Sequence, residues 1–335
     1  MKAFVTGSTG LLGNNLVRLL VEQGHEVKAL ARSRKKAELL FAGLDVDIVE
    51  GDMLDIPGFA AAMEGCEVLF HAAAYFRDYY QPGDHWKLLD AINIQGTHTL
   101  LIEAERHGIQ RVIYTSSSTV IGAQPSGQDA DESTPSGQET QWNLYAKSKL
   151  LAEKAVYQFL QNHSLPVVLI LPALMFGPGD IGPTSTGLMV QNFIARKIPG
   201  IIDAGFSVVD ARDVAQAMLA AVEKGKSGER YIVGGRYLDM AEIFQKLEQA
   251  SGVPSPRRTL PYSVTLIIAW LSETIARITH QTTLMTRDSV RTSHLKRRVS
   301  SQKALHELGI IFRPVEETLR DEIDWYRAHS SKLAF

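Results

Sequence analysis

The chain has 335 residues, 45% of them hydrophobic and 21% charged, and a formal net charge of −2 at pH 7. This length can bury a large core in one α/β unit or two domains, and the near-neutral charge gives no electrostatic reason to expect nucleic acid as a partner. The single cysteine, Cys66, excludes an internal disulfide and a cysteine-rich zinc site, and we expect no metal.

The order of apolar residues also bears on the compartment. The first predicted strand begins at the second residue, which leaves no room for a signal peptide. The longest apolar stretch, Val264–Leu271, is too short to span a bilayer, so we predict a packed helix face there. We therefore expect a cytoplasmic protein with no membrane partner.

The first predicted elements surround three glycines. A buried strand over Ala3–Val5 precedes them and a helix over Asn14–Gln23 follows. Gly7 permits a tight turn, Gly10 lets the backbone approach a pyrophosphate, and Gly13 lets helix and strand pack closely. The phosphate would then meet the free N–H groups of the helix. The predicted dinucleotide contacts in this loop are Gly7, Thr9, Gly10, Leu11 and Leu12.

Further apolar strands alternate with helical patterns along the chain. They are predicted at Glu26–Ala31, Val46–Glu50, Glu67–His71, Arg111–Thr115 and Pro166–Leu171. This alternation predicts an α/β fold of the Rossmann type, with a doubly wound parallel sheet and helices on both faces.

After Leu171 the alternation breaks up in a Pro- and Gly-rich stretch, where a smaller, mostly helical C-terminal lobe is expected to begin. The chain is predicted to return to the first domain through a helix over Asp210–Val222 and a strand over Arg230–Val233. We expect an NAD(P)-binding domain of residues 1–171 plus 200–234, and a substrate lobe of residues 172–199 plus 235–335. The polar loop 124–141 is long for a compact domain, which favours a mobile or functional loop.

The end of the second predicted strand bears on the choice of nucleotide. An acid at this point usually holds the ribose 2′-hydroxyl, whereas an arginine accommodates a 2′-phosphate. This chain has Arg32, followed by Arg34, Lys35 and Lys36, and no acid. We therefore predict NADP, with NAD as the alternative; solvated cations in an ordinary loop would also give this pattern. Asp52, after the third strand, is expected to accept from the adenine amino group, although taken alone it would read as a helix cap.

Tyr145 and Lys149 open a predicted helix, and their spacing places both side chains on one face, one turn apart. A lysine cation favours the phenolate, which brings the pKa of a tyrosine toward neutral pH. Hydroxyls cluster in the segment 116–119, just past the fifth strand, where ligands of open α/β sheets bind. A Tyr-x-x-x-Lys pair alone is common on exposed helices, so its combination with the glycine loop and the serines carries the prediction.

These motifs together resemble the extended short-chain dehydrogenases/reductases, the family of NAD(P)-dependent epimerases and dehydratases that includes dihydroflavonol-reductase-like enzymes. The matching segments, in chain order, are Thr6–Gly13, Gly51-Asp52, His71-Ala72-Ala73, Asn93 to Gly96-Thr97, Ser116-Ser117, and Tyr145 with Lys149. The resemblance covers most of the chain.

The resemblance implies a role for each matching residue. Tyr145 would be the general acid/base, Lys149 would bind the nicotinamide ribose and tune Tyr145, and Ser117 would hydrogen-bond the reacting oxygen. Ser117 is preferred to its neighbours because it lies five residues before Gly122, as the family's serine does. Pro172 would pack near the nicotinamide. The resemblance adds Met53, Ala72 and Ala73 to the cofactor contacts.

Two departures bear on the substrate. Nucleotide-sugar enzymes usually carry Pro-Tyr-Gly around the catalytic tyrosine and Arg-Pro after the sixth strand, but this chain has Asn143-Leu144-Tyr145-Ala146 and Leu171-Pro172. Both resemble the dihydroflavonol-reductase branch, which favours an NADP-dependent reductase of a small-molecule ketone or aldehyde. The alternatives are a nucleotide-sugar epimerase or dehydratase with tightly bound NAD(P), and a non-catalytic nucleotide sensor.

Three expectations concern packing. In the C-terminal lobe we predict solvated helical positions for the arginines, with charge for a bound diphosphate as the alternative, and core positions for the apolar residues, with the lining of a pocket as the alternative. The arginines are Arg287, Arg291, Arg297 and Arg298, and the apolar residues are Leu266, Ile267, Ile268 and Trp270. A homodimer is plausible because related enzymes often pair the helices that here would be Asp84–Arg106 and Tyr145–Asn162.

Overall fold

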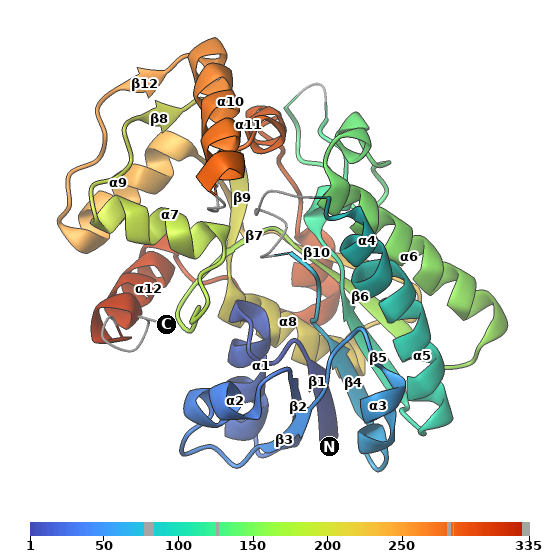
Figure 1. Ribbon diagram of the computed structural model, residues 1–335. Coiled ribbons are helices and arrows are strands. Elements are labelled where there is room, and N and C mark those ends of the chain that lie inside the picture. Colours follow the sequence, from blue (N-terminus) through green and yellow to red (C-terminus); the bar gives the residue numbers. More distant parts are fainter. Residues whose placement is uncertain (77–83, 125–126, 280–282, 284, 330–335) are drawn as a thin grey trace.

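The computed structural model describes every residue except 77–83, 125–126, 280–282, 284 and 330–335. Its centre is a seven-stranded parallel sheet in the order β10-β6-β5-β4-β1-β2-β3 (Figure 1). The strands are β1 (Lys2–Thr6), β2 (Glu26–Ala31), β3 (Asp47–Glu50), β4 (Val68–His71), β5 (Arg111–Thr115), β6 (Val167–Pro172) and β10 (Arg230–Val233). The predicted strands and the Rossmann-type fold class are therefore confirmed.

Helices cover both faces of this sheet because the strands are apolar on both faces. On β1, Ala3 and Val5 belong to the core beneath α1 (Leu11–Glu22) and α8 (Ala211–Lys224). Phe4 points to the opposite core, which contains side chains of α3, α5 and α6. These helices span Pro57–Ala60, Gly96–Arg106 and Leu144–Asn162, and the short α2 spans Arg34–Leu40.

The strand order reverses beside β1, which pairs with β2 on one side and β4 on the other. In an open α/β sheet, ligands bind in the crevice at such a reversal, outside the carboxyl ends of the strands. The loop of three glycines leaves β1 at this end.

The remaining elements form a second body around its own core. Its three-stranded sheet has the order β11-β9-β7, and a two-stranded ribbon pairs β8 with β12. The strands are β7 (Leu174–Phe176), β8 (Ile201–Ile202), β9 (Gly205–Asp210), β11 (Arg236–Asp239) and β12 (Thr259–Leu260). The helices are α7 (Ser185–Ile194), α9 (Met240–Ser251), α10 (Tyr262–Thr279), α11 (Arg287–His294) and α12 (Val315–His329).

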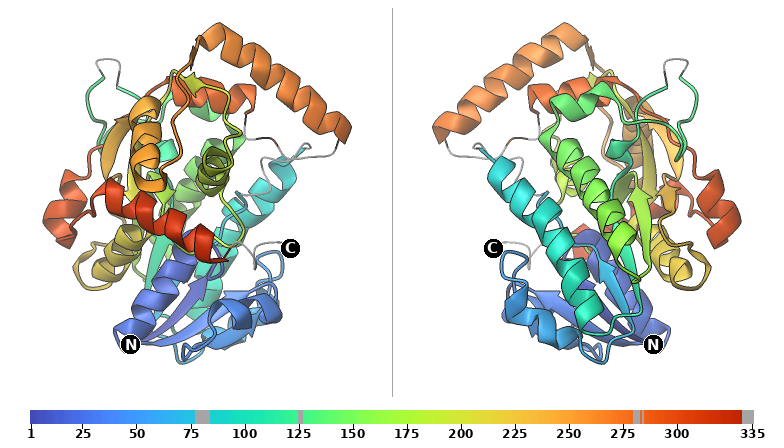
Figure 2. Two further views of the ribbon diagram at one scale, coloured as in Figure 1. Left: turned by 90° about the vertical axis from the view of Figure 1, so that its left-hand side faces the viewer. Right: turned by 90° about the vertical axis from the view of Figure 1, so that its right-hand side faces the viewer.

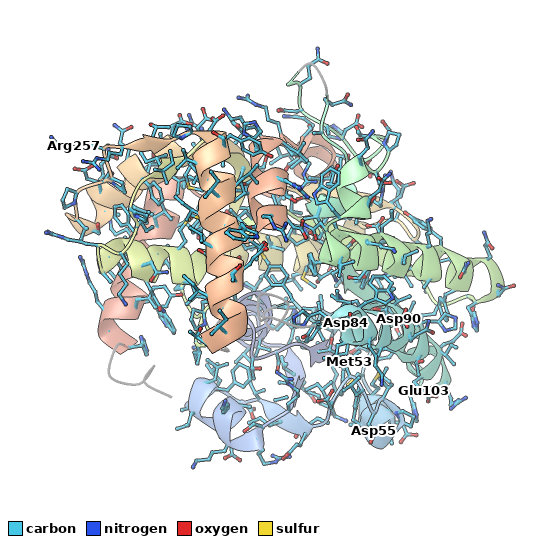
Figure 3. The ribbon with its side chains drawn as sticks, turned by 45° about the horizontal axis from the view of Figure 1, so that its top comes forward. Met53, Asp55, Asp84, Asp90, Glu103 and Arg257 are labelled. Carbon is cyan, nitrogen blue, oxygen red and sulfur yellow. The ribbon has the colours of Figure 1, made fainter. Side chains whose placement is uncertain are left out.

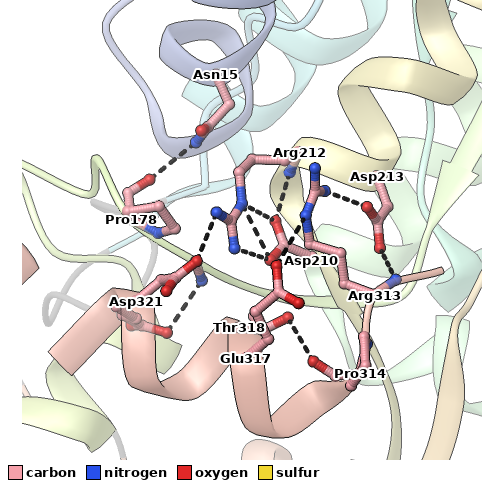
Figure 4. Close-up of polar contacts among 12 residues, drawn as sticks. Asn15, Pro178, Asp210, Arg212, Asp213, Arg313, Pro314, Glu317, Thr318 and Asp321 are labelled. Carbon is pink, nitrogen blue, oxygen red and sulfur yellow. Dashed lines mark hydrogen bonds and ion pairs between the residues drawn. The ribbon is translucent and has the colours of Figure 1, made fainter. Parts of the chain in front are cut away.

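The start of α8 and the body around α12 are joined by charged side chains (Figure 4). Arg212 donates to Asp210 and to Asp321 of α12, at 2.7 Å each. Arg313, just before α12, pairs with Asp213 of α8. These pairs fix the C-terminal helix against the helix that returns to the main sheet.

Several predicted boundaries differ from the structure. The first helix begins at Leu11, three residues before the prediction, because Gly10 serves as its N-cap. The single helix predicted over Asp84–Arg106 is divided into α4 (Trp86–Leu88), a π-helical turn over Leu89–Gln95, and α5. The loop 124–141 is anchored at Ala130, which bridges to Val299.

The packing predicted for α10 is wrong. Ile267 and Trp270 are 60% and 52% exposed, and Leu266 and Ile268 are only half-buried. The residues of this helix that face the protein are small: Thr265, Ala269 and Ala276. Within the described part of the chain, none of the helices is both long and apolar enough to cross a bilayer.

Candidate active site

The glycine loop has the geometry that a pyrophosphate needs. Gly7 has φ +67°, and a Cβ there would lie 2.6 Å from the Ala73 nitrogen. A Cβ on Gly13 would overlap the Gly7 carbonyl oxygen. A Cβ on Gly10 would meet only that same oxygen, at 3.4 Å, so the space over Gly10 is open. Gly10 is the N-cap of α1, so a pyrophosphate over it would meet the first turn of that helix, whose N–H groups have no intrahelical acceptor.

The expected cofactor contacts come together from different parts of the chain. They lie at the carboxyl ends of successive strands, because parallel strands all end at the same edge. Leu11 and Leu12 follow β1, Arg32 follows β2, Asp52 and Met53 follow β3, Ala72 and Ala73 follow β4, and Pro172 ends β6. Met53 is buried, and Pro172 pairs with Val233 of β10. These residues fit a dinucleotide that lies along this edge of the sheet.

The nucleotide end of the crevice distinguishes Arg32 from the cations beside it. Arg32 is exposed, and within the described residues its side chain forms no ion pair. Arg34 instead donates to the Ile48 carbonyl at 2.6 Å and so ties α2 to β3. The Asp52 carboxylate accepts from the Leu54 backbone N–H at 2.9 Å in a local turn, and it is not a helix cap, since the N-cap of α3 is Ile56.

Two neighbouring serines after β5, Ser116 and Ser117, have different hydrogen-bond partners. Ser116 is buried and donates to Glu153 at 2.5 Å, so its hydroxyl is already engaged. Ser117 is the N-cap of the next short helix, and its Oγ accepts from the Thr119 hydroxyl at 2.9 Å. Because a hydroxyl that accepts still has its own proton to donate, Ser117 remains able to bind a substrate oxygen.

Tyr145 and Lys149 lie on the first two turns of α6, as their spacing predicts. Asn143 caps this helix by accepting from the Ala146 N–H at 3.0 Å. Lys149 is 2% exposed and donates to the Thr115 carbonyl at 2.8 Å. Burial lowers the pKa of Lys149 to about 7, and the charge of Glu153 opposes this shift.

Glu153, one turn after Lys149, is a site residue that the sequence analysis did not identify. It is 2% exposed, accepts from Ser116, and pairs with Arg230 of β10 at 3.4 Å. Burial raises the pKa of the Glu153 carboxyl, while Ser116 and Arg230 lower it. The signal for Glu153 was its position on the same face as Tyr145 and Lys149.

Two buried polar links hold the elements of the site together. Asn93, in the π-helical turn, donates to Ser148 at 3.0 Å, and Ser148 donates to the Tyr145 carbonyl at 2.8 Å. His71, at the end of β4, hydrogen-bonds Thr6 at 2.8 Å and Thr97 at 3.1 Å. Burial, and then the Lys149 charge, lower the pKa of His71 to about 3, so the ring is neutral.

Arg297 does not lie on a solvated helix as predicted. It follows α11, and its side chain is buried against Glu139, which it bonds at 2.9 Å. The same nitrogen donates to the carbonyls of Thr119 and Ile121, at 3.4 and 3.2 Å. Glu139 in turn accepts, through its backbone carbonyl, from the N–H of Asn143, the cap of α6. One guanidinium therefore joins the segment after Ser117 to the segment before Tyr145.

Comparisons with known proteins agree with this geometry. The model of the NAD dependent epimerase/dehydratase family matches residues 3–234. The chain belongs to this family. It is an NAD(P)-dependent enzyme of the extended short-chain type, which confirms the resemblance in the sequence and makes a small molecule the fitting substrate.

Relatives and solved structures match nearly the whole enzyme. A protein of Synechocystis sp. with the provisional name dihydroflavonol 4-reductase is 34% identical over 97% of this chain and 94% of its own. Sterol demethylase protein B of Methylococcus capsulatus is 33% identical over 98% of both chains. The crystal structure of gox2253 superposes with a TM-score of 0.84 at 33% identity, over 98% of each chain.

Proposed function

We propose that this enzyme is an NADP-dependent reductase that transfers a hydride between nicotinamide and a ketone or aldehyde. The observation that carries the proposal is the hydrogen bond from Lys149 to the Thr115 carbonyl, which holds the Tyr145–Lys149 turn of α6 at the carboxyl end of β5, two residues before Ser117. The provisional name of the Synechocystis relative supports a reductase. Leu171-Pro172 in place of Arg-Pro supports a substrate without a diphosphate.

The proposed roles follow from the contacts of each side chain. Bound NADPH would supply the hydride, and the chain supplies orientation and the proton. Ser117 donates a hydrogen bond to the carbonyl oxygen, and Tyr145 gives that oxygen its proton. Lys149 donates a hydrogen bond to the Thr115 carbonyl. Its charge favours the phenolate of Tyr145, and it binds the nicotinamide ribose.

The proposal is tested by measuring NADPH consumption across a panel of aldehydes and ketones, beside binding of UDP- and GDP-sugars. We expect net oxidation of NADPH and no tight sugar-nucleotide binding. Tyr145→Phe should lower kcat by about 10²–10⁴-fold, because the general acid is lost while the ring remains. A retained cofactor without net turnover, together with tight sugar-nucleotide binding, would point to an epimerase or dehydratase instead.

The choice of NADP over NAD rests on Arg32. Losing a charge-assisted contact to the 2′-phosphate costs about 1.5–3 kcal/mol, so Arg32→Ala should weaken NADP binding by about 10- to 100-fold and leave NAD binding unchanged. Lys36→Ala, at a neighbouring exposed cation, is the matched control. Equal losses for both nucleotides, or none for NADP, would remove the assignment.

A further inference from the structure

The outward face of α10 carries a dense group of large apolar side chains. Six of them are 40–74% exposed: Val264, Ile267, Trp270, Leu271, Ile275 and Ile278. We call this group the α10 face. Monomeric proteins rarely expose so many large apolar side chains together unless the surface binds something.

The α10 face is continuous and one-sided. At about 100° per residue, its six side chains fall within an arc of about 140°. The other described residues in that arc, Ser263 and Thr274, are uncharged. The buried positions Thr265, Ala269 and Ala276 are on the opposite side. A helix that packs on a core and faces water on its other side shows the reverse arrangement, with large apolar residues inside.

The place of α10 in the fold leaves this face accessible. Figure 2 shows the helix projecting from the edge of the second body, and Figure 3 shows it in front of the other elements. It packs mainly beside α11, to which Glu273 of α10 is tied through Arg287 at 2.9 Å.

The charge of the surrounding segment indicates what would cover the α10 face. Residues 255–295 contain five Arg but only two Asp and Glu, whereas the rest of the chain has a net charge of −5. Arg257 and Arg258, directly before α10, are exposed, and Arg257 lies at the outer edge of the second body in Figure 3. Arg287 and Arg291 of α11 are exposed as well.

We infer that the α10 face docks on an anionic lipid surface. An apolar helix face that includes a tryptophan, with cations around it, is the arrangement by which helices lie in a membrane interface without crossing it. A second copy of this chain on the same face would bring the two basic segments together, so its charge does not complement the surface. The inference departs from the expectation of no membrane partner, and it does not depend on the proposed reaction.

The test is co-sedimentation of the full chain with vesicles of phosphatidylcholine alone and with 30% phosphatidylglycerol. We expect binding to the anionic vesicles, weakened about tenfold by Ile267→Ser and by Ile278→Ser, because each removes apolar area from the interface. Arg257→Ser should weaken binding about fivefold through lost attraction to the anionic headgroups. Ile311→Ser, which changes an 80% exposed apolar residue elsewhere, should leave binding unchanged.

A second measurement places the contact on α10 itself. Brominated lipid in the anionic vesicles should quench the fluorescence of Trp270, and Trp270→Phe should remove most of the quenching while binding persists. The inference is overturned if the chain ignores anionic vesicles, or if Ile311→Ser weakens binding as much as Ile267→Ser. It is also overturned if light scattering shows a dimer that Ile267→Ser dissociates.

Discussion

At the scale of single residues, Arg297 is the group whose position the sequence predicted least well. Its neighbours in the sequence are Lys and Arg, and a basic run is usually a solvated face. The structure instead buries its guanidinium between Glu139 and two backbone carbonyls. The partner lies 158 residues earlier, so no local pattern could have shown the pair.

Arg297→Lys tests whether this joint positions the catalytic groups. A lysine keeps the charge, but its ammonium stands on a flexible stem and lacks the rigid planar guanidinium, so we expect it to hold the three acceptors less firmly. We expect kcat to fall about 10- to 100-fold while the affinity for NADPH stays within about twofold, since the joint touches the serine and tyrosine segments and not the glycine loop. Steady-state kinetics and a fluorescence titration of NADPH, both well below the melting temperature, measure the two quantities.

Arg298→Lys is the matched control for this substitution. Arg298 is exposed, and its guanidinium lies 3.9 Å from the centre of the Tyr237 ring. Its replacement should leave kcat nearly unchanged. Equal losses from both substitutions, or a loss of NADPH affinity that matches the loss of kcat, would mean that Arg297 stabilises the lobe in general.

At the scale of elements, two glycines in the loop between β1 and α1 are required for different reasons. Gly13 is required because the chain packs on itself there: its Cβ would overlap the Gly7 carbonyl. Gly10 has room for a Cβ against the protein, and we propose that the space is kept for the pyrophosphate. The two glycines therefore predict different consequences for the same substitution.

Gly10→Ala should fold normally but bind NADP much more weakly, whereas Gly13→Ala should lose both stability and binding. Overpacking of this kind costs about 1–3 kcal/mol, so we expect a melting temperature several degrees lower for Gly13→Ala alone. Thermal unfolding without nucleotide, followed by a binding titration, tests the pair. If Gly10→Ala also lowered the melting temperature by the same amount, the proposed division of roles would be wrong.

The sequence predicted the elements of the main domain well because their signals are local. Short apolar runs mark the strands, and Tyr145 and Lys149 share a face through helical spacing alone. It failed at α10, where an apolar run was assigned to the core. Composition cannot distinguish a face that packs from a face that binds, because both are apolar. The π-helical turn at Asn93 was not predicted either, because no local sequence pattern marks it; Asn93 within it donates to Ser148 on another helix.

At the scale of the whole molecule, a buried carboxyl lies where the second body meets the main domain. Glu322 of α12 is 1% exposed and accepts from the Gly177 N–H at 3.0 Å. Burial raises its pKa well above the usual range, and the charges of Asp180 and Asp210 raise it further. The folded protein therefore holds a proton on Glu322 at pH values where the unfolded chain has lost it.

This difference predicts how stability depends on pH. A raised folded pKa contributes stability that is fully present below the ordinary glutamate pKa of about 4.5 and is lost as pH rises above it. Glu322→Gln keeps an acceptor for Gly177 without the proton, so its melting temperature should exceed that of the wild type at pH 8, by a margin that shrinks toward pH 4.5. Thermal unfolding across this range measures the margin, and one that stayed constant with pH would contradict the prediction.

The two-lobe division and the homodimer through α5 and α6 remain predictions at this scale. Light scattering in solution would test the dimer, and Ala155→Arg on α6 should disrupt it if that helix pairs across a two-fold axis. Ala155 is 8% exposed in the single chain, so a control measurement of the melting temperature belongs with it.

The Arg297–Glu139 pair also sets a limit on how relatives of this enzyme can be recombined. Exchanging the C-terminal part of the chain after β10 for that of a relative looks simple, since the main sheet would stay intact. Such a hybrid would inherit Glu139 from one parent and the residue facing it from the other. Unless the donor also places an arginine there, the hybrid would leave the buried Glu139 carboxylate unpaired next to the segment that follows Ser117. A workable exchange of the C-terminal part of the chain must therefore move both residues together.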